Sequence, residues 1–361
     1  MGSRFRFLLF PAFFYKRNYL QVLQMPDKKA LTHNSAMQDK YVNIAEIPTR
    51  ILTLGKWIEE PFDAAKEKEI VLVITGNPGV PGFYTAFITT LYQQLGRKLP
   101  VWIIGHAGHE EPDGKLREKV PQLSGNEHRY DLAGQLAHKI DFFKQFVPEH
   151  VKIHLIGHSV GAWTILQLLK REEIRKQVHH CYLLFPTIER MKISPAGKIF
   201  TERIERARFY SKIFYLIGFL PYAVRRYIIN HYIQKWNLPD AYLDAALKVA
   251  NERVLARILH MGQDQVDNVY DLEVDWIKKN KEILKFYYGT TDHWCPTSYY
   301  YDLLEKIPEI DAQLDELGMA HAFNVRKGPE MAAICAEWIK NNGVKGEETD
   351  LKDILMVTEQ N

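Results

Sequence analysis

The sequence has few cysteines, little net charge and no internal repeat. Its three cysteines, Cys181, Cys295 and Cys335, form neither a C-x-x-C metal pair nor a disulfide framework, which is typical of a reducing compartment. The formal net charge of +3 gives no reason to expect a nucleic-acid partner. With 361 residues, 46% of them hydrophobic and 25% charged, the chain has the composition of a globular protein with one large core.

The N-terminal region contains no apolar run long enough to cross a bilayer. Its first 25 residues carry four basic residues and no acid, around an apolar run at 7–15 that is interrupted by Pro11 and is too short to span. A signal peptide would have a longer apolar stretch and a cleavage site. Arg6 also occupies the position where myristoylation requires Ser or Thr. We therefore expect residues 1–38 to be an N-terminal extension that is either disordered or interfacial.

Strand and helix patterns alternate through the first half of the chain. Short apolar runs, typical of buried strands, are separated by segments with helical spacing; they occupy residues 69–75, 101–105, 151–156 and 178–185. A further strand is expected at 283–288 and a weaker one at 313–317, before a closing helix at 329–341. This alternation predicts an α/β fold, with a mostly parallel sheet covered by helices on both faces.

The alternation stops between the fourth predicted strand and the fifth. Almost everything at 194–280 has helical character, so we predict a helical cap inserted into a core made of residues 39–193 and 281–341. The charged residues 342–361 are expected to form a flexible tail.

The stretch HLIGHSVGAW (154–163) contains a G-x-S-x-G pentapeptide between a predicted strand and a predicted helix. That context is the one in which such a serine is exposed on a sharp turn as a nucleophile. Small residues are required on either side of so tight a turn, and Gly157 and Gly161 supply them. The backbone N–H of Val160 would be one oxyanion donor, and the turn TGNPG after the first predicted strand would supply a second, from Asn77.

A serine nucleophile of this kind needs an acid and a histidine later in the chain, in that order. Asp292 follows the strand at 283–288, within GTTDHWCP, and His321 lies about thirty residues further on, within GMAHAF. The imidazole would take the proton of Ser159 and the carboxylate would fix its tautomer. The alternative acids, Asp267, Asp271 and Asp275, all fall within the helical insertion.

Two other histidine-containing stretches have simpler interpretations. HAGHEE (106–111) resembles a metal site, but it is not H-E-x-x-H and it follows a strand, so we expect a polar loop at the rim of a pocket. His158, inside the turn, is expected to line the pocket instead of acting as a base. No metal or other cofactor is predicted.

Taken together, these motifs resemble the lipid droplet-associated hydrolases, a branch of the α/β hydrolases. The resemblance rests on GNPG, PVWIIGHAGH, LIGHSVGAW, LLFPTIERM, FYYGTTDHWCP and HAF, which occur in family order from about residue 71 to 339. It implies an α/β-hydrolase fold, with Ser159 as nucleophile, Asp292 as acid and His321 as general base. It also implies hydrolysis of neutral lipid esters, including cholesteryl esters, on lipid droplets and the cytosolic face of the endoplasmic reticulum.

Residues 209–233 are dense in aromatic and aliphatic side chains, with Gly218 and Pro221 interrupting them. A hairpin or two short helices could enter a lipid monolayer while Arg225 and Arg226 meet the headgroups, or could pack on the core as part of the cap. Three functions remain open at this point: a serine esterase at a lipid surface, a droplet-surface protein that controls droplet size or clustering with a weak or vestigial site, and a soluble esterase or peptidase for small substrates.

Overall fold

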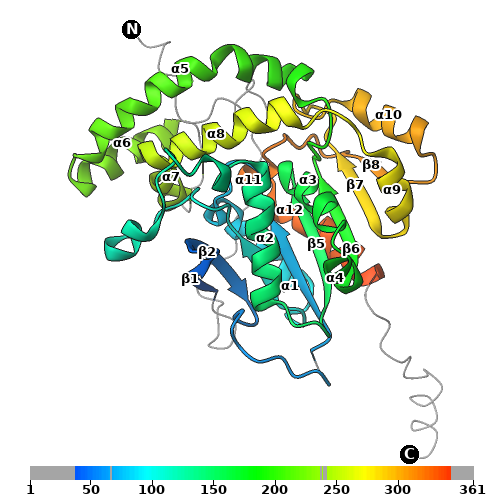
Figure 1. Ribbon diagram of the computed structural model, residues 1–361. Helices are drawn as coiled ribbons and strands as arrows, with labels where there is room; N and C mark the ends of the chain where they lie inside the picture. The colour runs from blue at the N-terminus through cyan, green and yellow to red at the C-terminus, as the bar shows by residue number, and fades with distance from the viewer. Residues whose placement is uncertain (1–36, 66, 236–237, 239–241, 343–361) are drawn as a thin grey trace, which may run out of the picture.

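Eight strands form one sheet in the computed structural model (Figure 1), which describes residues 37–65, 67–235, 238 and 242–342. Residues 1–36 of the expected N-terminal extension and residues 343–361 of the expected tail lie outside the described residues. In chain order the strands are β1 (Gln38–Ile44), β2 (Ile47–Leu54), β3 (Glu69–Ile74), β4 (Val101–Ile104), β5 (Lys152–His158), β6 (Val178–Leu184), β7 (Leu284–Tyr288) and β8 (Asp311–Leu314).

The sheet is mostly parallel. Its strand order is β1-β2-β4-β3-β5-β6-β7-β8, and β2 pairs antiparallel with both β1 and β4 while the other pairs are parallel. The predicted α/β class is therefore confirmed. Sequence reasoning did not identify β1 and β2, and it placed the last strand at 313–317, whereas β8 begins two residues earlier, at Asp311.

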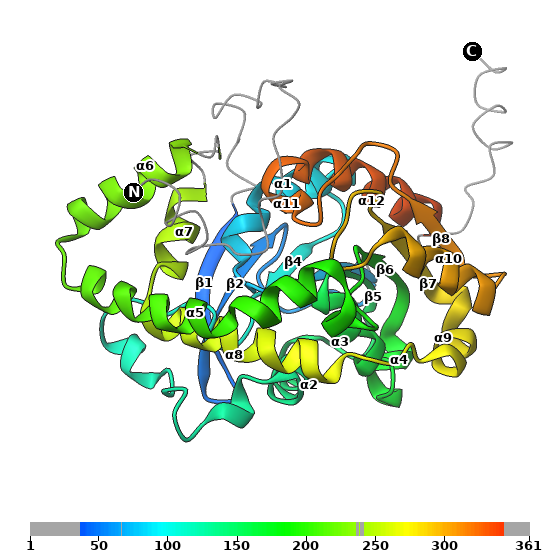
Figure 2. The same ribbon diagram turned by 90° about the horizontal axis from the view of Figure 1, so that it is seen from above.

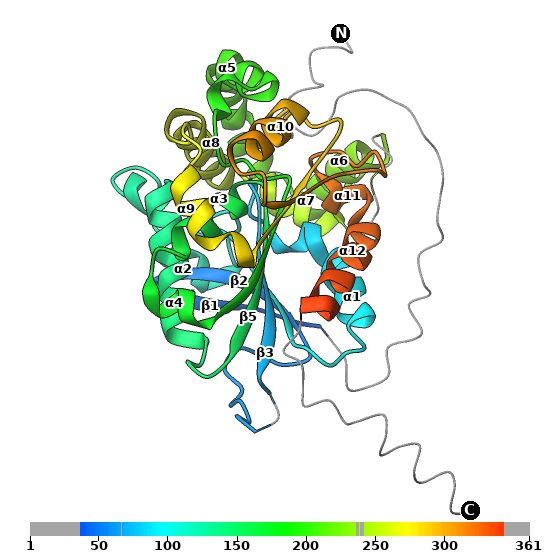
Figure 3. The same ribbon diagram turned by 90° about the vertical axis from the view of Figure 1, so that its right-hand side faces the viewer.

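Helices cover both faces of the sheet. Figure 3 shows α2 (Leu132–Phe146) and α4 (Glu172–Gln177) on one side of the strands, and α1 (Thr85–Gln94) and α12 (Gly328–Asn342) packed together on the other. Strands β3 and β4 are buried along their whole length, and apart from Glu69 all their residues are apolar. Burying one large apolar side chain contributes about 1.5–3 kcal/mol. Asp131 caps α2 by accepting from Gly134 N at 2.7 Å, a hydrogen bond typical of an aspartate just before a helix.

Shorter elements complete the core. They are α3 (Val160–Leu168), α10 (Thr297–Lys306), α11 (Phe323–Arg326) and the 3₁₀ turns η2 (Pro81–Tyr84), η3 (Gly114–Lys119), η4 (Glu127–Arg129), η5 (Met191–Ile193) and η7 (Lys281–Ile283).

The described chain between η5 and η7 is helical. It contains α5 (Pro195–Gly218), α6 (Tyr222–Lys235), α7 (Leu243–Val249), α8 (Glu252–Asn268) and α9 (Val274–Asn280). Helices α5 and α8 pack side by side above the strands (Figure 2). The interruption expected at Gly218 and Pro221 is present, because α5 ends at Gly218 and α6 begins at Tyr222. The structure thus has two helices there, as expected, although α5 with its 24 residues is longer than a short helix. No helix within the described ranges is long and apolar enough to cross a membrane.

Candidate active site

Ser159 lies on a sharp turn between β5 and α3. Its backbone has φ 56° and ψ −121°, a region that residues other than glycine rarely occupy. A Cβ added to Gly161 would come within 2.4 Å of the Ile74 carbonyl oxygen, and one added to Gly157 within 2.7 Å of the backbone of Gly161. Both positions therefore require glycine, as the pentapeptide predicted.

The predicted serine, histidine and aspartate lie in line. His321 Nε2 is 2.9 Å from Ser159 Oγ, and His321 Nδ1 is 2.6 Å from Asp292 Oδ2. The residues come from three separate loops, which the parallel strands β5 and β7 and the chain after β8 bring to one edge of the sheet. With Nδ1–H donated to Asp292, Nε2 is free to accept the serine proton.

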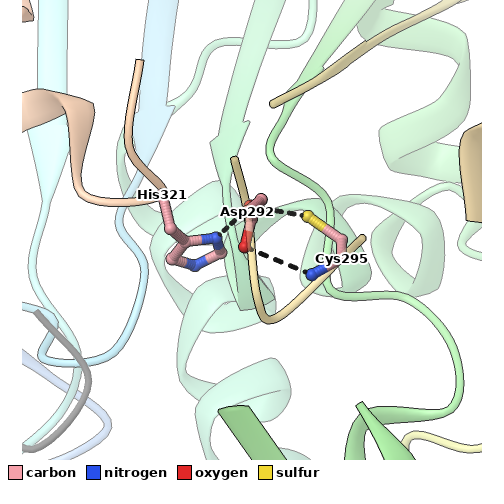
Figure 4. Close-up of side chains that lie close together, drawn as sticks. All are labelled: Asp292, Cys295 and His321. Atoms are coloured by element: carbon pink, nitrogen blue, oxygen red, sulfur yellow. Dashed lines mark hydrogen bonds and ion pairs between the residues drawn. The ribbon is translucent and has the colours of Figure 1, made fainter. Parts of the chain in front are cut away.

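The Asp292 carboxylate is fully buried and takes part in several hydrogen bonds (Figure 4). Its Oδ1 accepts from the backbone N–H groups of Trp294, at 2.7 Å, and Cys295, at 3.3 Å, and the Cys295 thiol donates to Oδ2 at 2.9 Å. Burial alone would raise the pKa of Asp292, but the neighbouring His321 and these hydrogen bonds hold it below its ordinary value. Asp292 is thus a carboxylate at neutral pH, as a partner for an imidazolium must be.

Asp292, Cys295 and His321 also form the one group within the described residues that has the side chains and spacing to hold a metal ion, with ligand atoms within 4.8 Å of one another. A metal-bound cysteine is a thiolate. Burial and the adjacent Asp292 carboxylate raise the pKa of the Cys295 thiol well above its ordinary value, so this sulfur stays protonated and serves as a hydrogen-bond donor to Asp292.

The loop after β3 approaches Ser159 closely. A Cβ added to Gly76 would lie 3.0 Å from Ser159 Cβ, which places the next residue, Asn77, beside the serine. Among the described residues, the backbone N–H groups of Asn77 and Val160 donate to no protein acceptor. The Asn77 side chain donates to the Ile258 carbonyl of α8 at 3.1 Å, which ties this loop to the helices above it.

The HAGHEE stretch is buried, and the expectation of a polar loop at a pocket rim is wrong. His106, His109, Glu110 and Glu111 are all at most 5% exposed. His109 Nδ1 accepts from Gly79 N at 2.9 Å, and His106 N donates to Gly79 O at 3.0 Å. The histidines thus brace the loop that carries Asn77.

The two acids of this stretch hold arginines from elsewhere in the chain. Glu110 pairs with Arg50 of β2 at 2.7 Å. Glu111 pairs with Arg257 of α8 at 2.9 Å, and the Arg257 side chain is fully buried. A buried pair of this kind joins the loop after β4 to α8, and breaking it leaves an uncompensated charge.

Three residues near the reacting groups were not found from the sequence. Thr187 Oγ1 lies 3.4 Å from Ser159 Oγ, Cys295 bonds Asp292, and Tyr84 bonds His158 at 2.7 Å. Thr187 lies within LLFPTIERM and Cys295 within TTDHWCP, but neither motif by itself predicts a role for these side chains. The alternative acid Asp267 instead pairs with Lys192 at 2.8 Å, away from His321.

A mostly parallel eight-stranded sheet with a serine turn after β5 is the fold of the α/β hydrolases. The fold matches a serine hydrolase from Cycloclasticus zankles with a TM-score of 0.55, at 16% identity over 85% of this chain and 99% of the other. It matches an esterase from Exiguobacterium antarcticum with a TM-score of 0.55, at 13% identity over 84% and 100%.

The chain belongs to the lipid droplet-associated hydrolase family, whose model matches residues 67–324. It is 47% identical to the lipid droplet-associated hydrolase of Drosophila melanogaster, over 85% of this chain and 99% of that protein. It is 36% identical to the one from Mus musculus, over 84% and 95%, and 33% identical to the one from Homo sapiens, over 85% and 96%. The family expected from the sequence motifs is thereby confirmed.

Proposed function

We propose that this hydrolase is a serine esterase that cleaves neutral lipid esters, cholesteryl or other fatty-acyl esters, through an acyl-enzyme intermediate. The observation that carries the proposal is the continuous line from Asp292 through His321 to Ser159, with contacts of 2.6 and 2.9 Å. A nucleophile, a base in contact with it and a buried carboxylate that orients the base are the parts that acyl transfer requires.

In the proposed first step, Ser159 Oγ attacks the acyl carbonyl carbon while its proton passes to His321 Nε2. The oxyanion that forms accepts hydrogen bonds from the backbone N–H groups of Asn77 and Val160, and losing one such donor typically costs about 2.7–4 kcal/mol. His321 then protonates the leaving alcohol. In the second step a water molecule gives its proton to His321 and attacks the acyl-enzyme, which releases the fatty acid and restores the Ser159 hydroxyl.

The proposed cap, residues 194–280, supports a hydrophobic substrate. Met261 of α8 and Phe200 of α5 belong to an apolar cluster that also includes Val160, the residue after the nucleophile, and Trp294, which follows Asp292. An acyl chain bound over Ser159 would meet these side chains. We assign the acyl and alcohol sites to the surfaces between the cap and the core.

The proposed place of action is a lipid surface, namely the droplet monolayer or the cytosolic face of the endoplasmic reticulum. Helix α6 buries Ile229 and Ile233 against the rest of the protein and exposes Tyr227 and Val224. Phe209, Phe219, Leu220, Tyr222 and Ile228 are exposed as well. We give the name α5–α6 tip to these seven exposed apolar residues, which lie on α5, on α6 and between the two helices. Apolar groups of this kind on a monomer mark interaction sites.

The experiment that tests the proposal is labelling with a fluorophosphonate, followed by hydrolysis of a panel of lipid esters presented in emulsions. Wild type should be labelled and Ser159→Ala should not, because the reagent reacts only with an activated serine. A Ser159→Ala protein that keeps full turnover of every ester would contradict the mechanism.

A second candidate is a droplet-surface protein that controls droplet size or clustering, with a weak or vestigial esterase site. The exposed α5–α6 tip favours it, because contact with a monolayer needs no chemistry. If Ser159→Ala restores droplet size in cells lacking the protein as well as wild type does, this second function explains the phenotype. If only wild type restores it, the esterase does.

A further inference from the structure

A chain of three hydrogen bonds connects the loop after β3 with the loop that carries His321. Gly76 N donates to the Tyr84 hydroxyl oxygen at 3.0 Å. The Tyr84 hydroxyl lies 2.7 Å from His158 Nδ1, and His158 Nε2 lies 2.8 Å from the carbonyl oxygen of His321. The chain thus begins one residue before Asn77 and ends on the backbone of the histidine that contacts Ser159.

The direction of every bond in the chain follows from its two ends. A backbone N–H can only donate and a carbonyl can only accept, so Gly76 donates to Tyr84 and His158 must carry its proton on Nε2. The Tyr84 hydroxyl then donates to His158 Nδ1. Burial lowers the pKa of His158 to about 3 and raises that of Tyr84 well above its ordinary value, so both side chains are neutral at physiological pH.

The chain is packed tightly around Ser159. A Cβ on Gly76 would lie 3.0 Å from Ser159 Cβ and 3.1 Å from His158 Nδ1. The His158 ring is 4.8 Å from the Phe323 ring and 5.2 Å from the His321 ring, measured between centroids. Tyr84 and His158 therefore have little room to turn, and no strand or helix ladder holds Gly76 or His321 in their place.

We propose that Tyr84 and His158 are positioning residues that fix the Asn77 amide and the His321 imidazole relative to each other on either side of Ser159. The inference rests on the proposed esterase function, because it assigns Asn77 and His321 to the same transition state. Groups that stabilise a transition state must be held in place before the reaction, and a displacement of about 1 Å can reduce the rate about 100-fold.

The test uses Tyr84→Phe, which keeps the ring and removes only the hydroxyl. Tyr92→Phe is the matched control, because Tyr92 is a buried tyrosine of the adjacent helix α1. We expect Tyr84→Phe to reduce kcat and the fluorophosphonate labelling rate about tenfold, equivalent to about 1.4 kcal/mol, with KM changed less than twofold. The control should match wild type, and the two variants should have similar Tm.

A double-mutant cycle with His158→Leu separates positioning from general destabilisation. Because Tyr84 acts through His158, Tyr84→Phe should reduce kcat less than twofold in the His158→Leu background. If Tyr84→Phe reduces kcat by the same factor in the His158→Leu background as in wild type, the two residues act independently and the proposal is overturned. His158→Gln serves the same cycle if His158→Leu does not fold.

The outcomes distinguish this inference from the function on which it rests. If wild type is labelled, Ser159→Ala is not, and Tyr84→Phe reacts as fast as wild type, the positioning role is wrong and the esterase stands. If Ser159→Ala is labelled like wild type, the esterase proposal fails and this inference fails with it.

Discussion

The carboxyl edge of the sheet and the α5–α6 tip are built in opposite ways. At the sheet edge the groups around Ser159 are mostly buried, and their positions are fixed by their neighbours. Gly161 has no room for a side chain, and Asp292 accepts several hydrogen bonds. At the tip, large apolar side chains face outward, with Phe219 71% and Tyr227 74% exposed. The first region can place atoms within a fraction of an ångström, whereas the second can only present apolar surface.

Under the proposed function, this difference corresponds to two separate tasks, the reaction and the binding to a lipid surface. Acyl transfer depends on groups held in place before the reaction, and the buried sheet edge supplies them. Binding to a lipid surface depends on apolar area that is left exposed in the folded protein, and in the proposed function the tip would supply that area. Substitutions should therefore separate the two properties, from large losses at the sheet edge to small ones at the tip.

The largest expected effect is that of Asp292→Asn. Losing the carboxylate should reduce kcat for a water-soluble ester by about 10³–10⁴-fold, because the imidazole loses the partner that fixes its tautomer. Asp267→Asn in α8 is the matched control and should stay within about twofold of wild type, since Asp267 pairs with Lys192 and an exposed pair contributes little. Equal losses from both variants would contradict the assignment of the acid.

A second comparison places the same substitution in the turn and in α8. Gly161→Ala should lower the free energy of unfolding by about 3 kcal/mol or more, because its Cβ would meet the backbone oxygen of Ile74 at 2.4 Å. The control is Gly262→Ala, where the Cβ meets the tip of the Phe200 ring at 2.8 Å and touches the Asn77 side-chain nitrogen at 3.4 Å, but meets no backbone atom that closely. A helix favours Ala over Gly by about 1 kcal/mol, so this change should stay within about 1 kcal/mol of wild type.

Urea unfolding followed by circular dichroism measures both variants. Similar losses of stability at Gly161 and Gly262 would show that the turn is no more constrained than the helix above it.

The parts of the fold that sequence predicted are those whose pattern is local. Strands β3 to β7 are short apolar runs, and Ser159, Asp292 and His321 each follow one strand or precede one helix in the order the fold requires. Their meeting at one edge follows from the parallel strands, so their chain order was informative without any knowledge of the loops.

The parts that sequence missed depend on distant partners. Strand β2 contains Arg50 and Thr53 among apolar residues, and Arg50 is accommodated only because Asp39 and Glu110 lie beside it. The burial of HAGHEE likewise depends on Arg257, which is 146 positions away from Glu111 in the chain. Tyr84 and His158 are 74 positions apart. A linear pattern contains no signal for such pairs.

A third prediction concerns acid sensitivity and the buried histidines of the sheet edge. Burial lowers the pKa of His109 and of His158 from 6.5 to about 3. Between these values the unfolded chain takes up protons on both rings and the folded chain does not, so stability falls as the pH falls. Each ring contributes a slope of up to about 1.4 kcal/mol per pH unit.

Replacing either histidine should flatten this dependence. His109→Gln should make the free energy of unfolding, measured in urea between pH 6.5 and pH 4, fall less steeply than in wild type. His128→Gln, on an exposed residue of η4, is the control and should leave the slope unchanged. An identical slope in all three proteins would mean that His109 does not remain neutral in the folded state.

The smallest effect on the enzyme itself is expected from the α5–α6 tip. Phe219→Ser combined with Tyr227→Ser should change the free energy of unfolding by about 0.5 kcal/mol or less and leave fluorophosphonate labelling unchanged, because both side chains are exposed. Binding to phosphatidylcholine-coated triolein droplets should fall more than tenfold, since burying each large apolar side chain contributes about 1.5–3 kcal/mol. Tyr301→Ser is the control, because Tyr301 of α10 is exposed as well, at 60%, but lies outside the tip. This variant should bind droplets like wild type. Flotation of droplets with wild type, the double variant and Tyr301→Ser measures the fraction of protein that binds.

If the double variant floats with droplets as well as wild type does, the tip is a surface of the cap with no part in lipid binding. Lipid binding and the reaction would then not be separated in the way that the sheet edge and the tip suggest.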